Sequence, residues 1–321
     1  MSGKLRVLVT GASGFAGRHL IRALEEEGPS AFEIFGTTYP DLPAPSAPRL
    51  FFLDLRSEKD VIGLVGEIKP DWIFHLAAIS NVRRSWETRG ETIETNIVGT
   101  YNLLEAVRQA APSARVLFVS SSEVYGAAAS PAEALTEETP IEIASPYAYS
   151  KAAGEMLCGF YGKVENADVV IARPFPHTGP GQSEDFVCSD WARQVALIEK
   201  GDRAPILKVG NLDLRRDFSD VRDVVRADML LMRKGRRGGV YNICSGRAIA
   251  LREILDFFVR ETSADTPISV EVDAAKLRKI DRPLEVGSHK KIADETGWLP
   301  RIPFDETLRD LLDYWRKKVR I

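Results

Sequence analysis

The chain has 321 residues, of which 44% are hydrophobic and 28% are charged, and its formal net charge is −3 at pH 7. These proportions are typical of folded globular proteins and exclude an intrinsically disordered chain. The slightly acidic balance gives no reason to expect a nucleic acid as the main partner. No apolar run approaches the roughly 20 residues that a membrane helix needs, so we expect no membrane association.

The sequence contains three cysteines, Cys158, Cys188 and Cys244, which are widely spaced and form no paired metal-ligand pattern. An odd number of scattered cysteines favours a reducing compartment, and no metal site is predicted. The apolar stretch at residues 5–9 is too short for the hydrophobic core of a secretory signal and runs into a glycine turn. We therefore expect a cytoplasmic protein.

The first half of the chain alternates short β-branched or aromatic runs with longer helical patterns. Strands are expected at residues 5–10, 32–37, 50–53, 72–75, 115–120 and 169–173. Helices are expected at residues 14–27, 58–69, 92–110 and 147–161. This alternation is typical of βαβ units, in which helices cover both faces of a parallel sheet. It predicts a doubly wound α/β fold of the Rossmann type.

Proline and glycine become concentrated after Arg173, which indicates a crossing point between two domains. Beyond it we expect helices at residues 186–200, 251–261 and 304–318 and a short strand at 206–209. We predict a nucleotide-binding domain at residues 1–175, to which residues 212–245 partly return. Residues 176–211 and 246–321 then form a smaller mixed α/β domain for the substrate. The cleft between them lies at the carboxyl ends of the strands, where such sheets bind ligands.

Three glycines, Gly11, Gly14 and Gly17, follow the first expected strand and open the first expected helix. Without side chains the backbone can approach a pyrophosphate, and the amino end of the helix offers free N–H groups and a positive dipole. Ser13 and Phe15 belong to the same turn. The pattern predicts a dinucleotide site, with a plain strand-to-helix turn as the alternative.

Tyr147 and Lys151 are four residues apart at the start of an expected helix. This spacing places both side chains on one helix face. A neighbouring ammonium favours the ionised form of a phenol, so Lys151 is expected to lower the pKa of Tyr147 for acid/base work. The alternative is a surface tyrosine and lysine that fall at helical spacing by chance.

The glycine spacing and the pair Tyr147 and Lys151 resemble the extended branch of the short-chain dehydrogenase/reductase superfamily. The resemblance implies that Ser121, four residues before Tyr125, is the third catalytic residue and stabilises a developing oxyanion. Asn96, in an N-x-x-G-T element, has either a direct role or a structural one. The cofactor contacts implied by the resemblance are Gly11, Ser13, Gly14, Phe15, Gly17, Thr37, Asp54, Leu55, Leu76, Ala77, Ala78, Asn96, Tyr147, Lys151 and Arg173.

The segment from Arg173 to Gln182, R-P-F-P-H-T-G-P-G-Q, is similar to R-P-F-N-H-x-G-P-G-Q of bacterial GDP-4-keto-6-deoxy-D-mannose reductases. Pro176 stands where that family has asparagine. The resemblance implies reduction of a GDP-bound C4 ketone to GDP-D-rhamnose. Arg216, in an R-D-F element, suits a diphosphate, with a buried ion pair to Asp217 or Asp220 as the alternative. The implied substrate contacts are Ser80, Ser85, His177, Val187, Lys208, Arg216 and Arg278.

Other functions stay open from the sequence. Glu123 is a candidate catalytic residue because related sugar-nucleotide 4,6-dehydratases carry a base there, although they have Thr-Asp or Thr-Ser before it and this chain has Ser121-Ser122. A dehydratase acting on GDP-mannose, an epimerase, and a non-catalytic nucleotide sensor are the alternatives. The family resemblance also implies a homodimer through a bundle of the helices at 92–110 and 147–161.

The sequence gives weaker evidence on whether the cofactor is NAD(H) or NADP(H). NAD-selective relatives end the second strand with an acidic residue that binds the ribose 2′-hydroxyl, and residues 35–39 contain none. This favours NADP(H). The reductases often have an arginine near the position of Tyr39, and its absence from the neighbouring sequence leaves NAD(H) possible.

Overall fold

The fold was analysed in a computed structural model, which describes residues 4–28, 30–39, 49–126, 134–264, 266–277 and 282–320. Its centre is a sheet of seven parallel strands in the order β11-β6-β5-β4-β1-β2-β3. The strands are β1 (Leu5–Thr10), β2 (Phe32–Thr38), β3 (Arg49–Phe52), β4 (Trp72–His75), β5 (Arg115–Val119), β6 (Asp168–Pro174) and β11 (Val240–Ile243). The strand order reverses between β1 and β4, which is where doubly wound sheets bind ligands. The predicted fold class is confirmed.

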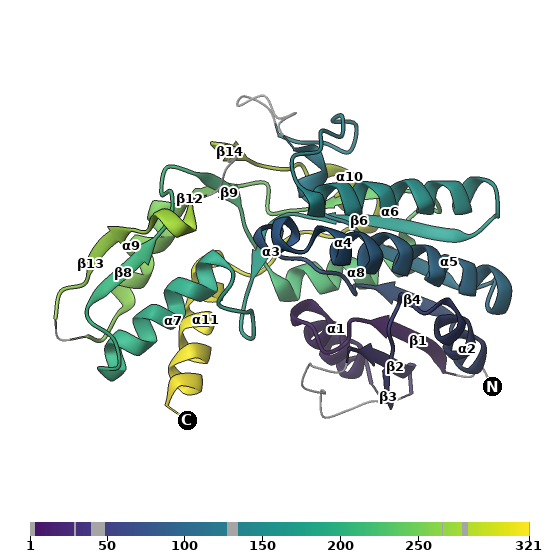
Figure 1. The fold of residues 1–321 in the computed structure, drawn as a ribbon, viewed down its shortest axis with the longest axis horizontal. Helices are drawn as coiled ribbons and strands as arrows, with labels where there is room; N and C mark the ends of the chain where they lie inside the picture. The colour runs from purple at the N-terminus through teal and green to yellow at the C-terminus, as the bar shows by residue number, and fades with distance from the viewer. Residues whose placement is uncertain are drawn as a thin grey trace.

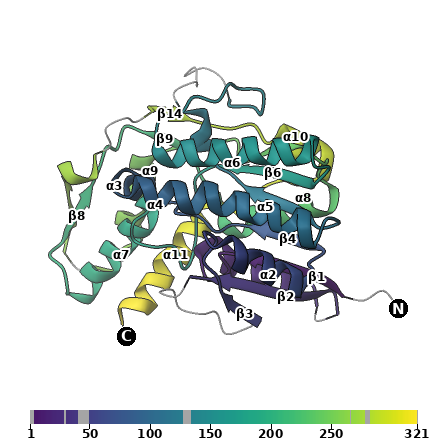
Figure 2. The same ribbon diagram turned by 45° about the vertical axis from the view of Figure 1, so that its right-hand side comes forward.

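Helices cover both faces of this sheet because its strand residues are apolar on both sides. In β1, Leu8 packs into one buried cluster while Val7 and Val9 pack into the other, as the two-residue period of a strand requires. One face carries α2 (Glu58–Ile68), α5 (Gly99–Ala110) and α6 (Pro146–Lys163). The other carries α1 (Phe15–Glu26), α8 (Val221–Lys234) and α10 (Lys290–Thr296). Figures 1 and 2 show α5 and α6 side by side on the sheet.

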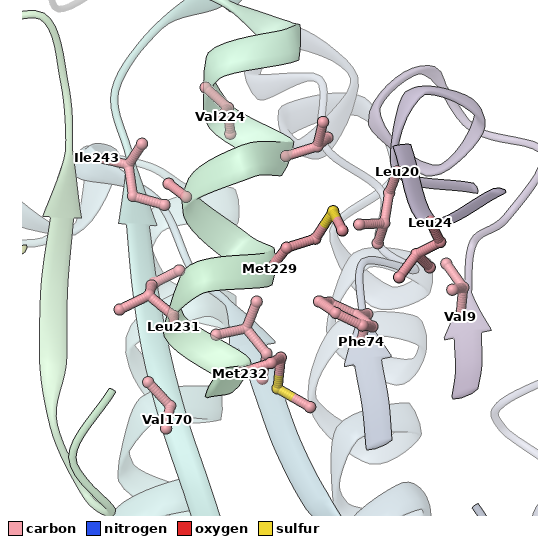
Figure 3. Close-up of a cluster of buried hydrophobic side chains, with 14 of the residues drawn as sticks. Val9, Leu20, Leu24, Phe74, Val170, Val224, Met229, Leu231, Met232 and Ile243 are labelled. Atoms are coloured by element: carbon pink, nitrogen blue, oxygen red, sulfur yellow. The ribbon is translucent and has the colours of Figure 1, made fainter. Parts of the chain in front are cut away.

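Helix α8 comes from the second half of the chain but packs on the sheet of the first half. Met229 and Met232 of α8 are buried beside Phe74 of β4, and Leu24 of α1 joins the same cluster (Figure 3). Burying a side chain of this size stabilises the fold by about 1.5–3 kcal/mol. Helix α8 and strand β11 were not predicted from the sequence as separate elements, although residues 212–245 were expected to return partly to the first domain.

A second lobe, at the left of Figure 1, has its own core. Its helices are α7 (Val187–Lys200), α9 (Leu251–Glu261) and α11 (Phe304–Val319). Its strands are β8 (Ile206–Val209) paired with β13 (Ser269–Val272), and β9 (Arg215–Asp217) between β12 (Ala248–Ala250) and β14 (Leu284–Glu285). Trp191 and Trp315 are fully buried where α7 and α11 meet. Between the lobes, β7 (His177–Thr178) pairs with β10 (Ser219–Asp220).

The helix expected at residues 92–110 is divided in the structure. Short helices α3 (Val82–Glu87) and α4 (Arg89–Ile93) lead into a π-helical turn, η1 (Glu94–Val98), before α5 begins. Such π-turns are often found at functional sites. The described residues also form two 3₁₀ turns, η2 (Ser122–Tyr125) and η3 (Ala274–Lys276).

Across the described ranges, no helix combines the length and apolar character needed to span a membrane. Cys158, Cys188 and Cys244 are buried and carry free thiols. Within the same part of the chain, no three histidine, cysteine or acidic side chains gather as metal ligands.

Candidate active site

The glycine turn between β1 and α1 is packed against backbone. Gly11 has φ of +73°, and a Cβ there would lie 2.9 Å from the Cα and N atoms of Ala77. A Cβ on Gly17 would lie 2.2 Å from the carbonyl oxygen of Gly11. Gly14, the N-cap of α1, provides no side-chain cap for the first helical turn. A compact turn followed by uncapped amides is a cradle that fits a pyrophosphate.

This turn is joined to the ends of the neighbouring strands. The hydroxyls of Ser13 and Thr38 form a buried hydrogen bond, and the Ala12 N–H donates to the Thr37 carbonyl at 2.9 Å. Phe15 is half-buried, and its ring stacks on that of His177 with centroids 6.1 Å apart. The turn therefore contacts both β2 and the segment that crosses between the lobes.

Asp54 and Leu55 follow β3, and Leu76, Ala77 and Ala78 follow β4. Hydrogen bonds from Arg56 to the half-buried Asp54 carboxylate lower the pKa of Asp54. Leu55 is buried, and its carbonyl accepts a hydrogen bond from Asn102 at 2.8 Å. Leu76, Ala77 and Ala78 are partly buried, and Ala77 faces Gly11. All five residues lie at the carboxyl edge of the sheet.

Ser121, Tyr147 and Lys151 reach this edge from two elements. Ser121 follows β5 and caps η2, because its hydroxyl accepts the Glu123 N–H at 3.2 Å. Tyr147 lies in the first turn of α6, where the Ser145 hydroxyl caps the Ala148 N–H at 3.0 Å. Ser85 fixes the same turn, since its buried hydroxyl accepts the Tyr147 N–H at 3.2 Å. Ser85 therefore has a clear role in holding α6.

Burial dominates the electrostatics of the pair on α6. It raises the pKa of Tyr147; a hydrogen bond with Ser121 partly offsets this, and the charge of Glu123 adds to it. Burial also lowers the pKa of Lys151 to about 8. The Lys151 ammonium donates to the Val119 carbonyl at 2.7 Å and lies 6.0 Å from the centre of the Tyr147 ring. The expected lowering of the Tyr147 pKa is therefore wrong for this geometry, because desolvation of the phenol outweighs a cation at that distance.

Arg173 forms a buried ion pair with Glu155 of α6, with 2.6 Å between Nη2 and Oε2. Its Nη1 donates to the Tyr125 hydroxyl at 2.9 Å, and that hydroxyl donates to Asn242 at 2.6 Å. Glu155 also accepts a hydrogen bond from Ser120, next to Ser121. The sequence predicts Arg173 as a cofactor contact. We assign it instead as a positioning residue, because its donors are directed to protein acceptors.

Asn96 lies in the π-helical turn and bridges two parts of the site. Its amide oxygen accepts the Ile79 N–H at 2.8 Å, and its amide nitrogen donates to the Ile79 carbonyl and to the Ser150 hydroxyl at 3.1 and 2.9 Å. Ser150 in turn donates to the Tyr147 carbonyl at 2.8 Å. Of the two roles left open by the sequence, this geometry supports the structural one.

Two arginines from distant segments meet beside η2. Arg216 of β9 and Arg282 both approach Glu285 of β14, with N–O distances of 3.7 and 3.4 Å. Glu285 is buried and accepts the Ser122 hydroxyl at 2.6 Å, while Arg282 lies 4.0 Å from Glu123. Among the described residues, Arg216 therefore approaches Glu285 rather than Asp217 or Asp220. Arg282 was not among the residues predicted from the sequence. No motif near Arg282 indicates that it approaches Glu123, which lies 159 positions earlier.

The remaining candidates are more scattered. His177 is half-buried and bonds through Nδ1 to the Phe175 carbonyl at 2.9 Å, and burial lowers its pKa. Ser80 is exposed in the loop after β4, and Lys208 is exposed on β8 in the second lobe. Val187 is the first residue of α7 and packs on the second core. Arg278 lies outside the described residues.

Comparison with known proteins adds a family to this geometry. The family model described as GDP-mannose 4,6 dehydratase matches residues 8–311. The chain is 36% identical to the GDP-6-deoxy-D-mannose reductase of Pseudomonas aeruginosa over 98% of both sequences. It is similar to the structure of RMD from the same organism in complex with NADPH, with a TM-score of 0.85, 34% identity, and 98% of this chain and 100% of that chain covered.

A dehydratase structure is also similar. It is the dTDP-glucose 4,6-dehydratase of Streptomyces venezuelae with NAD and TYD bound, with a TM-score of 0.83, 29% identity, and 98% and 97% of the two chains covered. Relatives of this fold thus include a reductase and a dehydratase.

Proposed function

This chain belongs to the GDP-mannose 4,6-dehydratase family of extended short-chain dehydrogenases/reductases, and we propose that it reduces GDP-4-keto-6-deoxy-D-mannose at C4 to GDP-D-rhamnose, using NADPH. The observation that carries the proposal is that the buried residues Tyr147 and Ser121 converge at the carboxyl edge of the sheet, where Ser121 lowers and Glu123 raises the pKa of the phenol. The arginine pair Arg216 and Arg282 lies beside them. A carbonyl and an anionic substituent are the two groups that such a site recognises. The similarity to the reductase of Pseudomonas aeruginosa supports the same substrate.

The residues divide the work of carbonyl reduction. A reduced nicotinamide supplies the hydride that adds to the ketone carbon. Tyr147 donates its phenolic proton to the ketone oxygen, and Ser121 donates a hydrogen bond to that oxygen as negative charge develops. The raised pKa keeps Tyr147 protonated at neutral pH, as a proton donor requires. Lys151, with a pKa of about 8, is mostly cationic there and holds the cofactor ribose.

In this proposal the arginine pair binds the diphosphate of the nucleotide-sugar. Arg216 and Arg282 come from strands of the second lobe and from the segment before β14, and Glu285 between them fixes both guanidinium groups. A guanidinium binds phosphate oxygens through two parallel hydrogen bonds, which a lysine cannot do. In this proposal the large sheet, with α8 and β11, holds the cofactor, and the second lobe holds the nucleotide-sugar.

We also infer a homodimer. Helices α5 and α6 leave apolar side chains in solvent, above all Met156 and Phe160, which are 76% and 51% exposed, together with Tyr101. Large apolar groups gathered on one helical face are typical of a protein–protein contact. A bundle of these two helices from each subunit would cover them.

Incubation with GDP-4-keto-6-deoxy-D-mannose and NADPH tests the proposal. We expect NADPH to be consumed in a one-to-one ratio with the ketone, and NMR of the product to identify the C4 configuration of GDP-D-rhamnose. Tyr147→Phe should abolish turnover and leave NADPH affinity largely unchanged, because it removes only the proton donor.

A 4,6-dehydratase is the second candidate, because Glu123 places a carboxylate near Tyr147 in the position where dehydratases of this type carry their base. It would convert GDP-mannose with no added reductant and no net change in NADPH. That result, with no reaction of the ketone, would contradict the reductase.

A further inference from the structure

Arg56 lies beside Tyr39 at the end of β2, although residues 35–39 themselves contain no arginine. Leu53 follows β3 and donates its N–H to the Thr38 carbonyl at 3.1 Å, so the chain after β3 passes beside the end of β2. Arg56, 17 positions after Tyr39, thereby reaches it and donates from Nη2 to the Tyr39 hydroxyl at 3.1 Å. Its guanidinium carbon also lies 6.0 Å from the centre of the Tyr39 ring.

We propose that Arg56, held by Asp54 and Tyr39, recognises the 2′-phosphate of NADP(H) and sets the preference for this cofactor over NAD(H). The inference rests on the proposed nicotinamide chemistry and adds the residue that selects the cofactor. In dinucleotide-binding folds the adenosine ribose docks at the end of the second strand, where an acidic residue selects NAD and an arginine accommodates the phosphate of NADP.

The contacts of Arg56 orient its guanidinium group and leave part of that group accessible to a ligand. Nε and Nη2 donate to the Asp54 carboxylate at 2.9 and 2.7 Å, which fixes the guanidinium plane. Within the described ranges, Nη1 makes no hydrogen bond, and it lies 3.9 Å from Oε2 of Glu94. The side chain is 34% exposed, so an anion can reach it. An oriented guanidinium with donors to spare suits a phosphate.

The surrounding groups also disfavour recognition of a ribose hydroxyl by an acid. Asp54 lies two residues beyond the end of β3, and its carboxylate accepts hydrogen bonds from three nitrogen atoms of Arg56. Thr38, the last residue of β2, carries a hydroxyl and no acid, and this hydroxyl is hydrogen-bonded to Ser13. Glu94 is a second acidic group near the guanidinium, besides Asp54, and its carboxylate would compete with a phosphate for Nη1. Its removal should therefore strengthen NADPH binding.

Fluorescence titration of the full chain with NADPH and with NADH, in the absence of substrate, tests the inference. Arg56→Gln should weaken NADPH roughly 10- to 100-fold, the range expected for charge-assisted hydrogen bonds, and change NADH less than about twofold. Tyr39→Phe should weaken NADPH by a smaller factor, and Glu94→Gln should strengthen it. Arg49→Gln is the matched control, because Arg49 is an exposed arginine on β3 that pairs with Glu33, and it should change neither affinity.

Equal weakening of both cofactors by Arg56→Gln, or no change in either, would overturn the inference. Thermal unfolding shows whether each variant is folded. If Arg56→Gln is unfolded, Arg56→Lys takes its place; it keeps the charge but loses the planar guanidinium, and it should bind NADPH with an intermediate affinity. The product assay with saturating NADPH is independent. If the wild-type chain reduces the ketone but Arg56→Gln weakens NADPH and NADH equally, only the role of Arg56 is refuted. If Arg56→Gln weakens NADPH selectively but the wild-type chain leaves the ketone untouched, only the reductase is refuted.

Discussion

Replacing Glu155 by glutamine tests how the catalytic edge of the sheet is held together. Glu155 and Arg173 are 7% and 6% exposed, and two hydrogen bonds join them at 2.9 and 2.6 Å. Glutamine has the same size but no charge, and its amide nitrogen would face a guanidinium that has only donors. Burial would lower the Arg173 pKa, yet the hydrogen bonds and charge of Glu155 leave it raised. Without Glu155 the arginine still stays cationic at neutral pH, because a guanidinium does not lose its proton in proteins.

The cost follows from this burial. Removing one partner of a buried ion pair leaves an uncompensated charge and typically costs about 3–5 kcal/mol. The free energy of unfolding of a natural protein is only about 5–15 kcal/mol, so Glu155→Gln should lose roughly a fifth or more of it. Removing both charges, as in Glu155→Leu combined with Arg173→Met, should cost less than the single change, because no charge is left buried.

Urea unfolding followed by tryptophan fluorescence measures the difference. The exposed pair of Lys290 and Asp294 on α10 provides the control, and Asp294→Asn should cost less than about 1 kcal/mol. If Glu155→Gln costs no more than this control, the pair is solvated and the positioning role of Arg173 is refuted. If the double variant is the least stable of all, the pair itself stabilises the fold and the reasoning from desolvation fails.

Three further results are expected. Asp228 is buried in α8, and its Oδ1 has no hydrogen-bond partner among the described residues. Burial raises the pKa of Asp228 well above its usual value, so the stability of the wild-type protein falls as the pH rises through that pKa. Asp228→Asn should therefore raise the free energy of unfolding at pH 7 by about 1–3 kcal/mol, with a smaller gain near pH 4, and a less stable variant at pH 7 would contradict this. Met156→Glu with Phe160→Glu should convert a dimer into a monomer in sedimentation, whereas Val272→Glu, exposed on β13, should not; a double variant that sediments like the wild type would exclude this interface. Because the pKa of Lys151 is lowered to about 8, the ammonium is lost above that pH and kcat/KM should fall there, and a profile that stays flat to about pH 9 would count against the role of Lys151.

The features that could be predicted from sequence are those encoded over short distances. The alternation of strands and helices, the glycine turn at Gly11 and the four-residue spacing of Tyr147 and Lys151 each depend on neighbouring residues. The carboxyl ends of parallel strands meet at one edge, so the same pattern also indicated that Ser121 and the turn lie on the same side of the sheet.

Contacts between distant segments were the part that sequence could not supply. Arg56 and Tyr39 meet because β2 and β3 are neighbours, and Arg282 meets Glu123 because β14 pairs with β9. The sign of the Tyr147 pKa shift was misjudged for a related reason. Helical spacing places a cation near the phenol, but the depth to which both groups are buried depends on the whole fold.

The raised pKa of Tyr147 bears on the direction of the reaction. A dehydratase that regenerates its cofactor must first remove a hydride from C4, and the hydroxyl proton released there needs a basic group to accept it. A reductase adds a hydride to a ketone, and the alkoxide that forms needs an acid. Burial keeps Tyr147 protonated, and Glu123 reinforces this because a second negative charge nearby disfavours the phenolate. Glu123 therefore helps to keep Tyr147 in the protonated form from which a ketone reductase starts, which is consistent with the proposed reaction.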